Sequence, residues 1–300
     1  MVLECSEPKG AMKQTQESGQ GRLVCGAVWP MVFCLLVGCS SSLRRSLPDD
    51  KVLLGISLED REHVVQRLGF TNGFGGHIAR DSRGRWMAIP VTVDTKANAR
   101  DVRLVVITAT NVYTKPWSFG NRMGDDGEIA IWHDTNGLNY VRSGERLPAS
   151  TRCIDASGEW VLVGARDRRP WLAKLETPFV VAAEPPESNT FRRIFAHGDV
   201  VHTFARRGWR KEEGPLRYLV YDFDRPGTQP LKEVALPWGR AAREMDPESG
   251  LAVVTGNQRA WALCWLMNVE TGKRERIPSL LQYLIVRKEV AQKWIELTKR

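Results

Sequence analysis

The residue best placed for a defined reaction is a cysteine at the end of an apolar run. Cys39 follows 16 uncharged residues, 23–38, which are preceded by Arg22 and close on Leu36-Val37-Gly38. A basic residue, an apolar run and a small residue, in this order, indicate a secretory signal and its cleavage site. A membrane-spanning helix needs about 20 apolar residues, so this run of 16 is short for a permanent anchor. We therefore expect cleavage after Gly38; the alternative is a short uncleaved membrane helix.

The tetrapeptide Leu36-Val37-Gly38-Cys39 resembles the lipobox of bacterial lipoproteins. In that family the cysteine thiol receives a diacylglycerol, and the cysteine becomes the new N-terminus. The resemblance implies a signal peptide over residues 1–38, a lipidated Cys39 and a lipidated polar tether over residues 39–51. In bacterial lipoproteins, an Asp directly after the cysteine resembles a signal for retention in the inner membrane. This chain has Ser40 at that position. We expect a protein anchored by lipid in the cell envelope, at the outer membrane rather than the inner one.

Composition describes an ordinary globular chain after the signal. The 300 residues are 42% hydrophobic and 26% charged, with a formal net charge of +8. Residues 1–38 hold as many basic as acidic residues, so the mature chain keeps this charge. A basic surface favours anionic partners, here an envelope protein or an anionic polymer. No nucleic-acid motif organises the basic residues, and we expect no nucleic-acid partner.

A repeated turn organises the mature chain. Asp81-Ser-Arg-Gly84-Arg-Trp86 and Asp155-Ala-Ser-Gly158-Glu-Trp160 each lead into an apolar run typical of a strand. Looser copies surround Gly127, Gly198 and Gly250. Asp can bond the turn backbone, Gly accepts a positive φ, and the aromatic side chain can pack between sheets. The glycines recur about every 42 residues, close to the length of one four-stranded blade.

Residues 74–278 therefore resemble the WD-repeat and quinoprotein-like propeller families. The resemblance implies an all-β domain over residues 52–300, a β-propeller of about six blades. A β-sandwich pair or an irregular β-barrel is the alternative. A propeller closes by pairing strands from its two ends. Residues 52–56 suit one end, and residues 283–286 with 294–297 suit the other, although 280–297 also fit a closing helix.

The sequence shows no catalytic signature. The histidines lack metal-ligand spacing, and no nucleophile elbow or nucleotide-binding loop is present. We nominate no catalytic residue and expect no metal and no cofactor. An insertion over residues 207–216 breaks the repeat and holds Arg207, Trp209, Arg210 and Lys211. Arg and Trp dominate binding hot spots. We therefore expect a non-enzymatic, lipid-anchored binding or scaffold protein; the alternative is a propeller enzyme acting on an envelope or extracellular glycan.

Replacing Cys39 by Ser should block lipidation, because the cysteine thiol is the group that receives the diacylglycerol in the family that the tetrapeptide resembles. We expect an unprocessed precursor without the added lipid mass, detectable by mass spectrometry of the membrane fraction. A mature protein of unchanged mass and fractionation would contradict the lipobox interpretation.

Replacing Trp209 and Arg210 by Ala should lower capture of envelope partners at least tenfold, about 1.4 kcal/mol, because both are predicted hot-spot residues. Thermal unfolding of the variant should match that of the wild type. Undiminished capture in a pull-down would remove this insertion from the binding surface.

Overall fold

The computed structural model divides the chain into two units, Met1–Cys39 and Ser40–Arg300. The residues it describes all belong to the second unit: 43–70, 72–73, 78–93, 101–116, 122–123, 130–134, 137–140, 151–165, 169–174, 180–185, 189–207, 214–225, 229–256 and 263–299. The predicted signal peptide and Cys39 therefore lie outside the described residues. Within the predicted tether, Leu43 and Leu47 are buried, and Lys51 begins the first strand.

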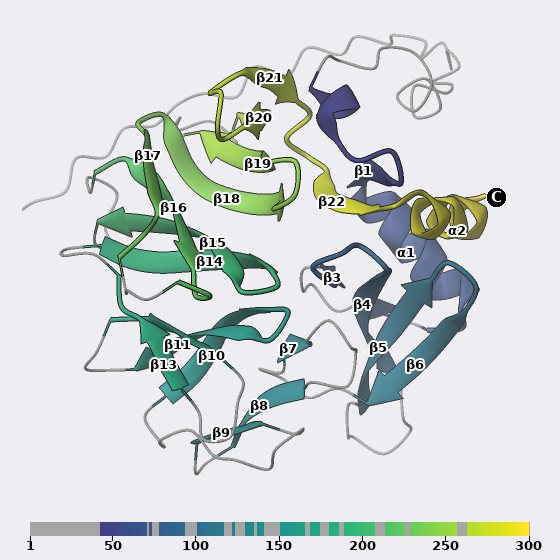
Figure 1. Cartoon of the computed structure of the whole chain (residues 1–300). Coiled ribbons are helices and arrows are strands. Elements are labelled where there is room, and N and C mark those ends of the chain that lie inside the picture. Colours follow the sequence, from purple (N-terminus) through teal and green to yellow (C-terminus); the bar gives the residue numbers. More distant parts are fainter. Residues whose placement is uncertain are drawn as a thin grey trace, which may run out of the picture. The chain divides into compact units, whose positions relative to one another are not determined.

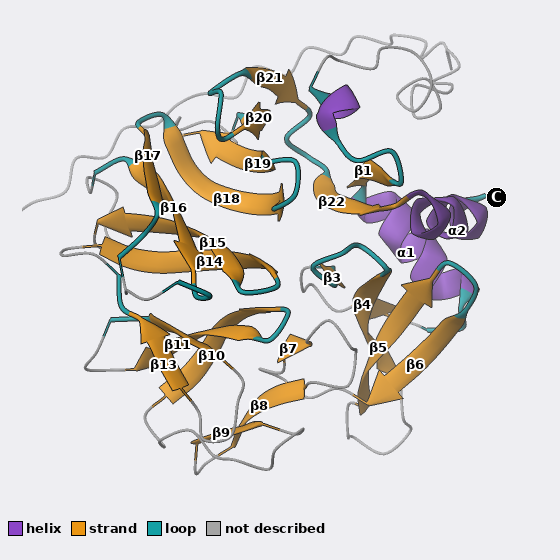
Figure 2. Ribbon diagram, viewed as in Figure 1, coloured by secondary structure: helices purple, strands orange, loops and turns teal. Residues whose placement is uncertain are grey.

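The second unit consists of antiparallel sheets that stand around a centre, the arrangement of a β-propeller (Figures 1 and 2). In the described part, four sheets have four strands or more and form blades. The first contains β2 (Asn72–Gly73), β3 (Ala79–Arg80), β4 (Trp86–Val93), β5 (Asp101–Thr108) and β6 (Val112–Pro116). The second contains β10 (Thr151–Ser157), β11 (Trp160–Ala165), β12 (Trp171–Lys174) and β13 (Val180–Ala183). The third contains β14 (Asn189–His197), β15 (Val200–Arg207), β16 (Leu216–Asp222) and β17 (Lys232–Leu236). The fourth contains β18 (Gly239–Asp246), β19 (Leu251–Gly256), β20 (Cys264–Asn268) and β21 (Arg274–Ile277).

The prediction of an all-β propeller is confirmed, and the prediction of about six blades is wrong. Beside the four blades, the described residues form two smaller sheets. These contain β7 (Arg122–Met123), β8 (Ala130–Asp134) and β9 (Gly137–Tyr140), and β1 (Lys51–Ile56) with β22 (Gln282–Arg287). The expected number of six comes from dividing the length of the domain by the repeat of about 42 residues, which assumes that every residue belongs to a four-stranded blade. Each end of the domain instead contributes one strand and one helix. These are β1 with α1 (Leu58–Arg67) at the N-terminal end, and β22 with α2 (Lys288–Thr298) at the C-terminal end.

The repeated turn adopts the predicted conformation in four copies, and the copy at Gly127 lies outside the described residues. Gly84, Gly158, Gly198 and Gly250 all have a positive φ, between 59° and 70°. The turn glycine follows the first of two paired strands, as β10 to β11 and β14 to β15 show. Asp246 Oδ2 accepts a hydrogen bond of 3.0 Å from the Ser249 backbone N–H within its turn. The sequence pattern therefore marks the step from the first to the second strand of a blade.

The aromatic side chain at one of these turns, Trp160, packs between two blades. Trp160 begins β11 and is 2% exposed, within a core cluster formed by the second and third blades. Its indole Nε1 donates to the Gly198 carbonyl at 3.0 Å, and its ring stacks on Phe223 with centroids 4.4 Å apart. The Trp at this position therefore joins two blades both by packing and by a satisfied polar group.

The first and last strands close the propeller. β1 pairs with β22 in antiparallel register, from Lys51 opposite Arg287 to Ile56 opposite Gln282. The predicted pairing of residues 52–56 with 283–286 is confirmed. Residues 294–297 belong to α2, in agreement with the alternative of a closing helix.

Helix α1 is a feature that the sequence analysis missed. Ser57 caps it by accepting a hydrogen bond of 3.0 Å from the Asp60 backbone N–H, and Glu59 and Asp60 lie in the first turn, where the helix dipole favours acidic side chains. Val64 and Val65 are buried in a cluster that also contains side chains of α2, β1 and β4. Only these two apolar residues of the helix are fully covered, which is too short a pattern to show helical periodicity.

Replacing Gly84 by Ala should destabilise the domain more than replacing Gly198 by Ala. Both residues have a positive φ, which disfavours any Cβ by about 1 to 2 kcal/mol. At Gly84 the Cβ would also lie 2.8 Å from Val286 Cα in β22, whereas at Gly198 it would meet no atom within 4 Å. We expect an additional loss of about 1 to 3 kcal/mol in the free energy of unfolding for Gly84→Ala, measured by urea denaturation. Equal losses in the two variants would contradict the close approach of this turn to the closing strand.

Candidate functional site

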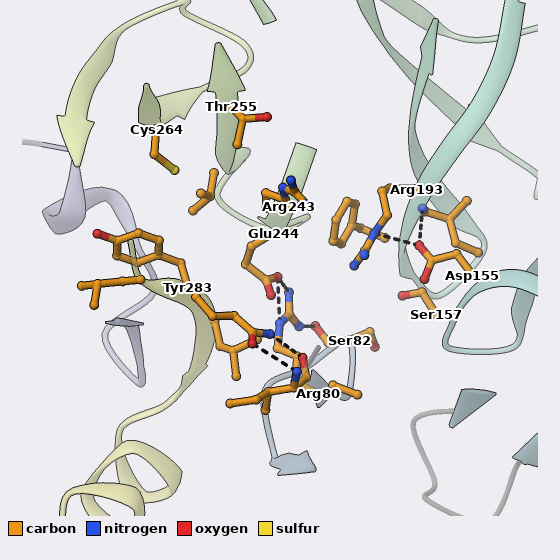
Figure 3. Close-up of a pocket in the computed structure, with 18 of the residues that line it drawn as sticks. Arg80, Ser82, Asp155, Ser157, Arg193, Arg243, Glu244, Thr255, Cys264 and Tyr283 are labelled. Carbon is orange, nitrogen blue, oxygen red and sulfur yellow. Dashed lines mark hydrogen bonds and ion pairs between the residues drawn. The ribbon is translucent and has the colours of Figure 1, made fainter. Parts of the chain in front are cut away.

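A cavity of about 510 Å³ lies among the inner strands of the propeller (Figure 3). Its wall includes residues of β3, β10, β14, β18 and β22. β14 contacts both β10 and β18, and β18 also contacts β22. The strand before each repeated turn therefore faces the centre, and its side chains line the cavity. A volume of this size suits a small ligand or a short segment of a larger one.

A buried ion pair forms one side of the cavity. The Arg80 and Glu244 side chains are 7% and 4% exposed, and Arg80 Nε donates to Glu244 Oε1 at 2.8 Å. Arg80 Nη1 also donates to the carbonyls of Asp81 at 2.6 Å and Ser82 at 3.0 Å. Burial acts to lower the pKa of Arg80, but the Glu244 carboxylate, supported by Asp246 and Asp81, raises it above its ordinary value. Arg80 stays charged and holds the Glu244 carboxylate in place.

A second ion pair joins the inner strands of the second and third blades. Arg193 Nε lies 3.1 Å from Asp155 Oδ2, which also accepts a hydrogen bond of 3.0 Å from the Ile194 backbone N–H. Nearby, Ser157 Oγ accepts from the Ala196 backbone N–H at 2.9 Å. Asp155 is the aspartate of the repeated turn motif. Here its carboxylate contacts two groups of the neighbouring blade, the Arg193 guanidinium and the Ile194 backbone N–H.

Arg243 differs from these arginines. It lies on β18 in the cavity wall and is exposed to solvent. Among the described residues it forms no ion pair or hydrogen bond, and Figure 3 shows dashed contacts from Arg80 and Arg193 but none from Arg243. Arg61 also lines the cavity; burial lowers its pKa, with Glu62 acting in the opposite direction. Arg243 is therefore the guanidinium most accessible to a ligand.

The opposite side of the cavity carries an aromatic ring and a thiol. Tyr283 donates to the Pro278 carbonyl at 2.9 Å, which fixes the ring. Cys264 is a free, buried cysteine, and burial raises the pKa of its thiol. A protonated thiol is a poor nucleophile.

The structure does not test the binding residues expected from the sequence. Arg207 ends β15, and its side chain, like all of Trp209, Arg210 and Lys211, lies outside the described residues. Conversely, the cavity residues were not predicted. A signal for them existed, because Arg80 and Glu244 stand one and two residues before the motif aspartates Asp81 and Asp246. The signal is incomplete, because other charged residues of these strands, such as Arg240 of β18, do not line the cavity.

Within the described ranges, no helix is long and apolar enough to cross a membrane. The same residues contain no group of three His, Cys, Asp or Glu side chains that could hold a metal ion.

Solved structures similar to this chain include TolB from Acinetobacter baumannii, with 11% identity over 71% of this chain and a TM-score of 0.45. An acylaminoacyl peptidase from Pyrococcus horikoshii has 11% identity over 67% of this chain and a TM-score of 0.41. A eukaryotic initiation factor has 10% identity over 70% and a TM-score of 0.38. The matches cover 57%, 39% and 57% of those chains respectively, less than two thirds of each. No protein-family model and no curated protein sequence matches the chain. Because the TM-scores are below 0.5, the functions of these proteins do not indicate a function for this chain.

Proposed function

We propose that this chain is a non-enzymatic binding protein of the bacterial cell envelope, and that its propeller receives a ligand in the central cavity. One observation carries the proposal: both carboxylates of the described cavity wall are ion-paired with arginines of the chain, whereas Arg243 is open to a ligand. The cavity thus offers a cation and apolar surface to a partner.

The same observation weighs against hydrolysis of a glycan. A glycosidase needs one carboxyl group that donates a proton and a second that acts as base or nucleophile. Glu244 contacts Arg80 and also accepts from the Met245 backbone N–H at 2.9 Å. Asp155 contacts Arg193 and the Ile194 backbone N–H. Neither carboxylate is placed to exchange a proton with a substrate.

The envelope location of the proposal rests on the N-terminal sequence. Cleavage after Gly38 and lipidation of Cys39 would attach the propeller to a membrane, with the outer membrane favoured by Ser40. The insertion with Trp209 and Arg210 is a second proposed contact, for an envelope protein or an anionic polymer.

Obstructing the cavity should abolish ligand capture without unfolding the domain. Ser279 lines the cavity and is exposed, so Ser279→Trp should place an indole at the cavity without disturbing the core. Gln66→Trp, at an exposed position of α1 away from the cavity lining, is the matched control. Immobilised wild-type and variant domains would be incubated with solubilised envelope extract, and bound components analysed by mass spectrometry.

We expect the control to retain the components that the wild type binds, and Ser279→Trp to lose at least nine tenths of them, about 1.4 kcal/mol of binding free energy. The components should be recovered chemically unchanged. Equal capture by all three proteins would refute binding in the cavity, and conversion of a captured component to product would establish an enzyme.

A further inference from the structure

We infer that the central cavity recognises a carboxylate that has an apolar group beside it, with the carboxylate on Arg243. This inference rests on the proposed binding function and specifies its ligand. Two sources share this chemistry: the free C-terminal end of a polypeptide with an apolar last residue, and a free fatty acid.

The charges around Arg243 leave its guanidinium available to an anion. The neighbouring Glu244 contacts Arg80, and Asp155 contacts Arg193. Both carboxylates of the described cavity wall are therefore engaged by other cations. Arg243 is exposed and has no ion-pair partner in the described part of the chain. A guanidinium presents parallel N–H donors that match the two oxygens of a carboxylate.

The number of available cations favours a carboxylate over a phosphoryl group. A phosphoryl group carries a charge between about −1.5 and −2 and three acceptor oxygens. Arg80 is buried and ion-paired, Arg61 is buried, and Arg193 is ion-paired with Asp155, although its side chain is 38% exposed. One open guanidinium balances the single charge of a carboxylate.

Apolar side chains of the same cavity specify the remainder of the ligand. Val253 and Leu284 lie in the wall but are only 1% and 3% exposed, so the apolar surface open to a ligand comes from neighbouring leucines. Leu281 lines it as a partly buried residue, and the adjacent Leu280 is 83% exposed. An exposed leucine at the rim of a cavity offers apolar surface that a ligand can cover. A carboxylate on Arg243 with an apolar neighbour on the leucines uses both kinds of surface.

The test compares two arginines of one strand. Arg243→Gln removes the cation from the cavity, and Arg240→Gln, also on β18 and exposed but absent from the cavity lining, is the matched control. The probes are N-acetyl-Ala-Leu-Leu with a free C-terminus, the same peptide as its C-terminal amide, and octanoate. Isothermal titration calorimetry measures the Kd of each probe with the wild type and both variants, and urea denaturation confirms that the variants fold.

We expect the wild type and Arg240→Gln to bind one or both acids, and Arg243→Gln to bind them at least tenfold more weakly. The peptide amide should bind the wild type at least tenfold more weakly than the peptide acid. Binding of the peptide acid alone identifies a polypeptide end as the source, and binding of octanoate alone identifies a fatty acid. Binding of both supports the shared chemistry.

The failure of this inference is distinguishable from failure of the proposed function. If neither acid binds, or if acid and amide bind equally and Arg243→Gln has no effect, carboxylate recognition at Arg243 is wrong. The Ser279→Trp capture experiment then still decides whether the cavity binds a ligand at all.

Discussion

The antiparallel pairing of β1 with β22 holds together strands from opposite ends of the domain, and the sheets keep their places around the centre because of it. Closing so long a loop has an entropic cost, although each doubling of length adds only about 0.6 kcal/mol. The closing pair is fixed from both sides. Toward the first blade, the Arg287 backbone N–H donates to the Gly84 carbonyl at 2.9 Å. Toward the fourth blade, Lys51 Nζ donates to Asp246 Oδ1 at 2.6 Å, with both side chains buried.

The Arg80–Glu244 pair spans the same junction, from β3 of the first blade to β18 of the fourth. Replacing a buried ion pair by apolar side chains is often neutral or stabilising, so this pair is weak grounds for high stability. Removing one partner alone leaves a buried charge and costs about 3 to 5 kcal/mol. We therefore expect the pair to fix the relative position of the two blades more than to add stability.

Local rules made the repeated turns and the closing strands predictable. Gly84 and Gly158 must adopt a positive φ in a tight turn whatever the rest of the chain does, and Trp160 must find an apolar surface. The number of blades was not predictable in this way, because it depends on which strands pair over long distances. Helix α1 was not predicted because, beyond its N-cap and acidic first turn, it has only two buried valines, too few to show a helical spacing of apolar residues.

The cavity was less predictable than the fold, because it is assembled from residues that are far apart in the sequence. Glu244 lies 164 residues from Arg80, and Ile194 lies 39 residues from Asp155. A single charged residue in a strand does not reveal its partner. The position of a charge in the strand before a repeated turn does not by itself show that it faces the centre, because Arg243 lines the cavity and Arg240 of the same strand does not. Whether a charge at the centre is neutralised depends on the neighbouring blade.

On our proposal, ligand binding and closure are coupled, because the cavity wall comes from both ends of the domain. β3 and β22 supply one part of the wall, and β10, β14 and β18 supply the rest. A ligand that binds only the folded protein adds RT ln(1 + [L]/Kd) to its stability, about 2.7 kcal/mol at a hundredfold excess over Kd. Arg80 and Arg193 find their counter-ions within the chain. On our proposal the counter-ion of Arg243 is supplied by the ligand, which would then stabilise the junction that the chain closes with its own two ends.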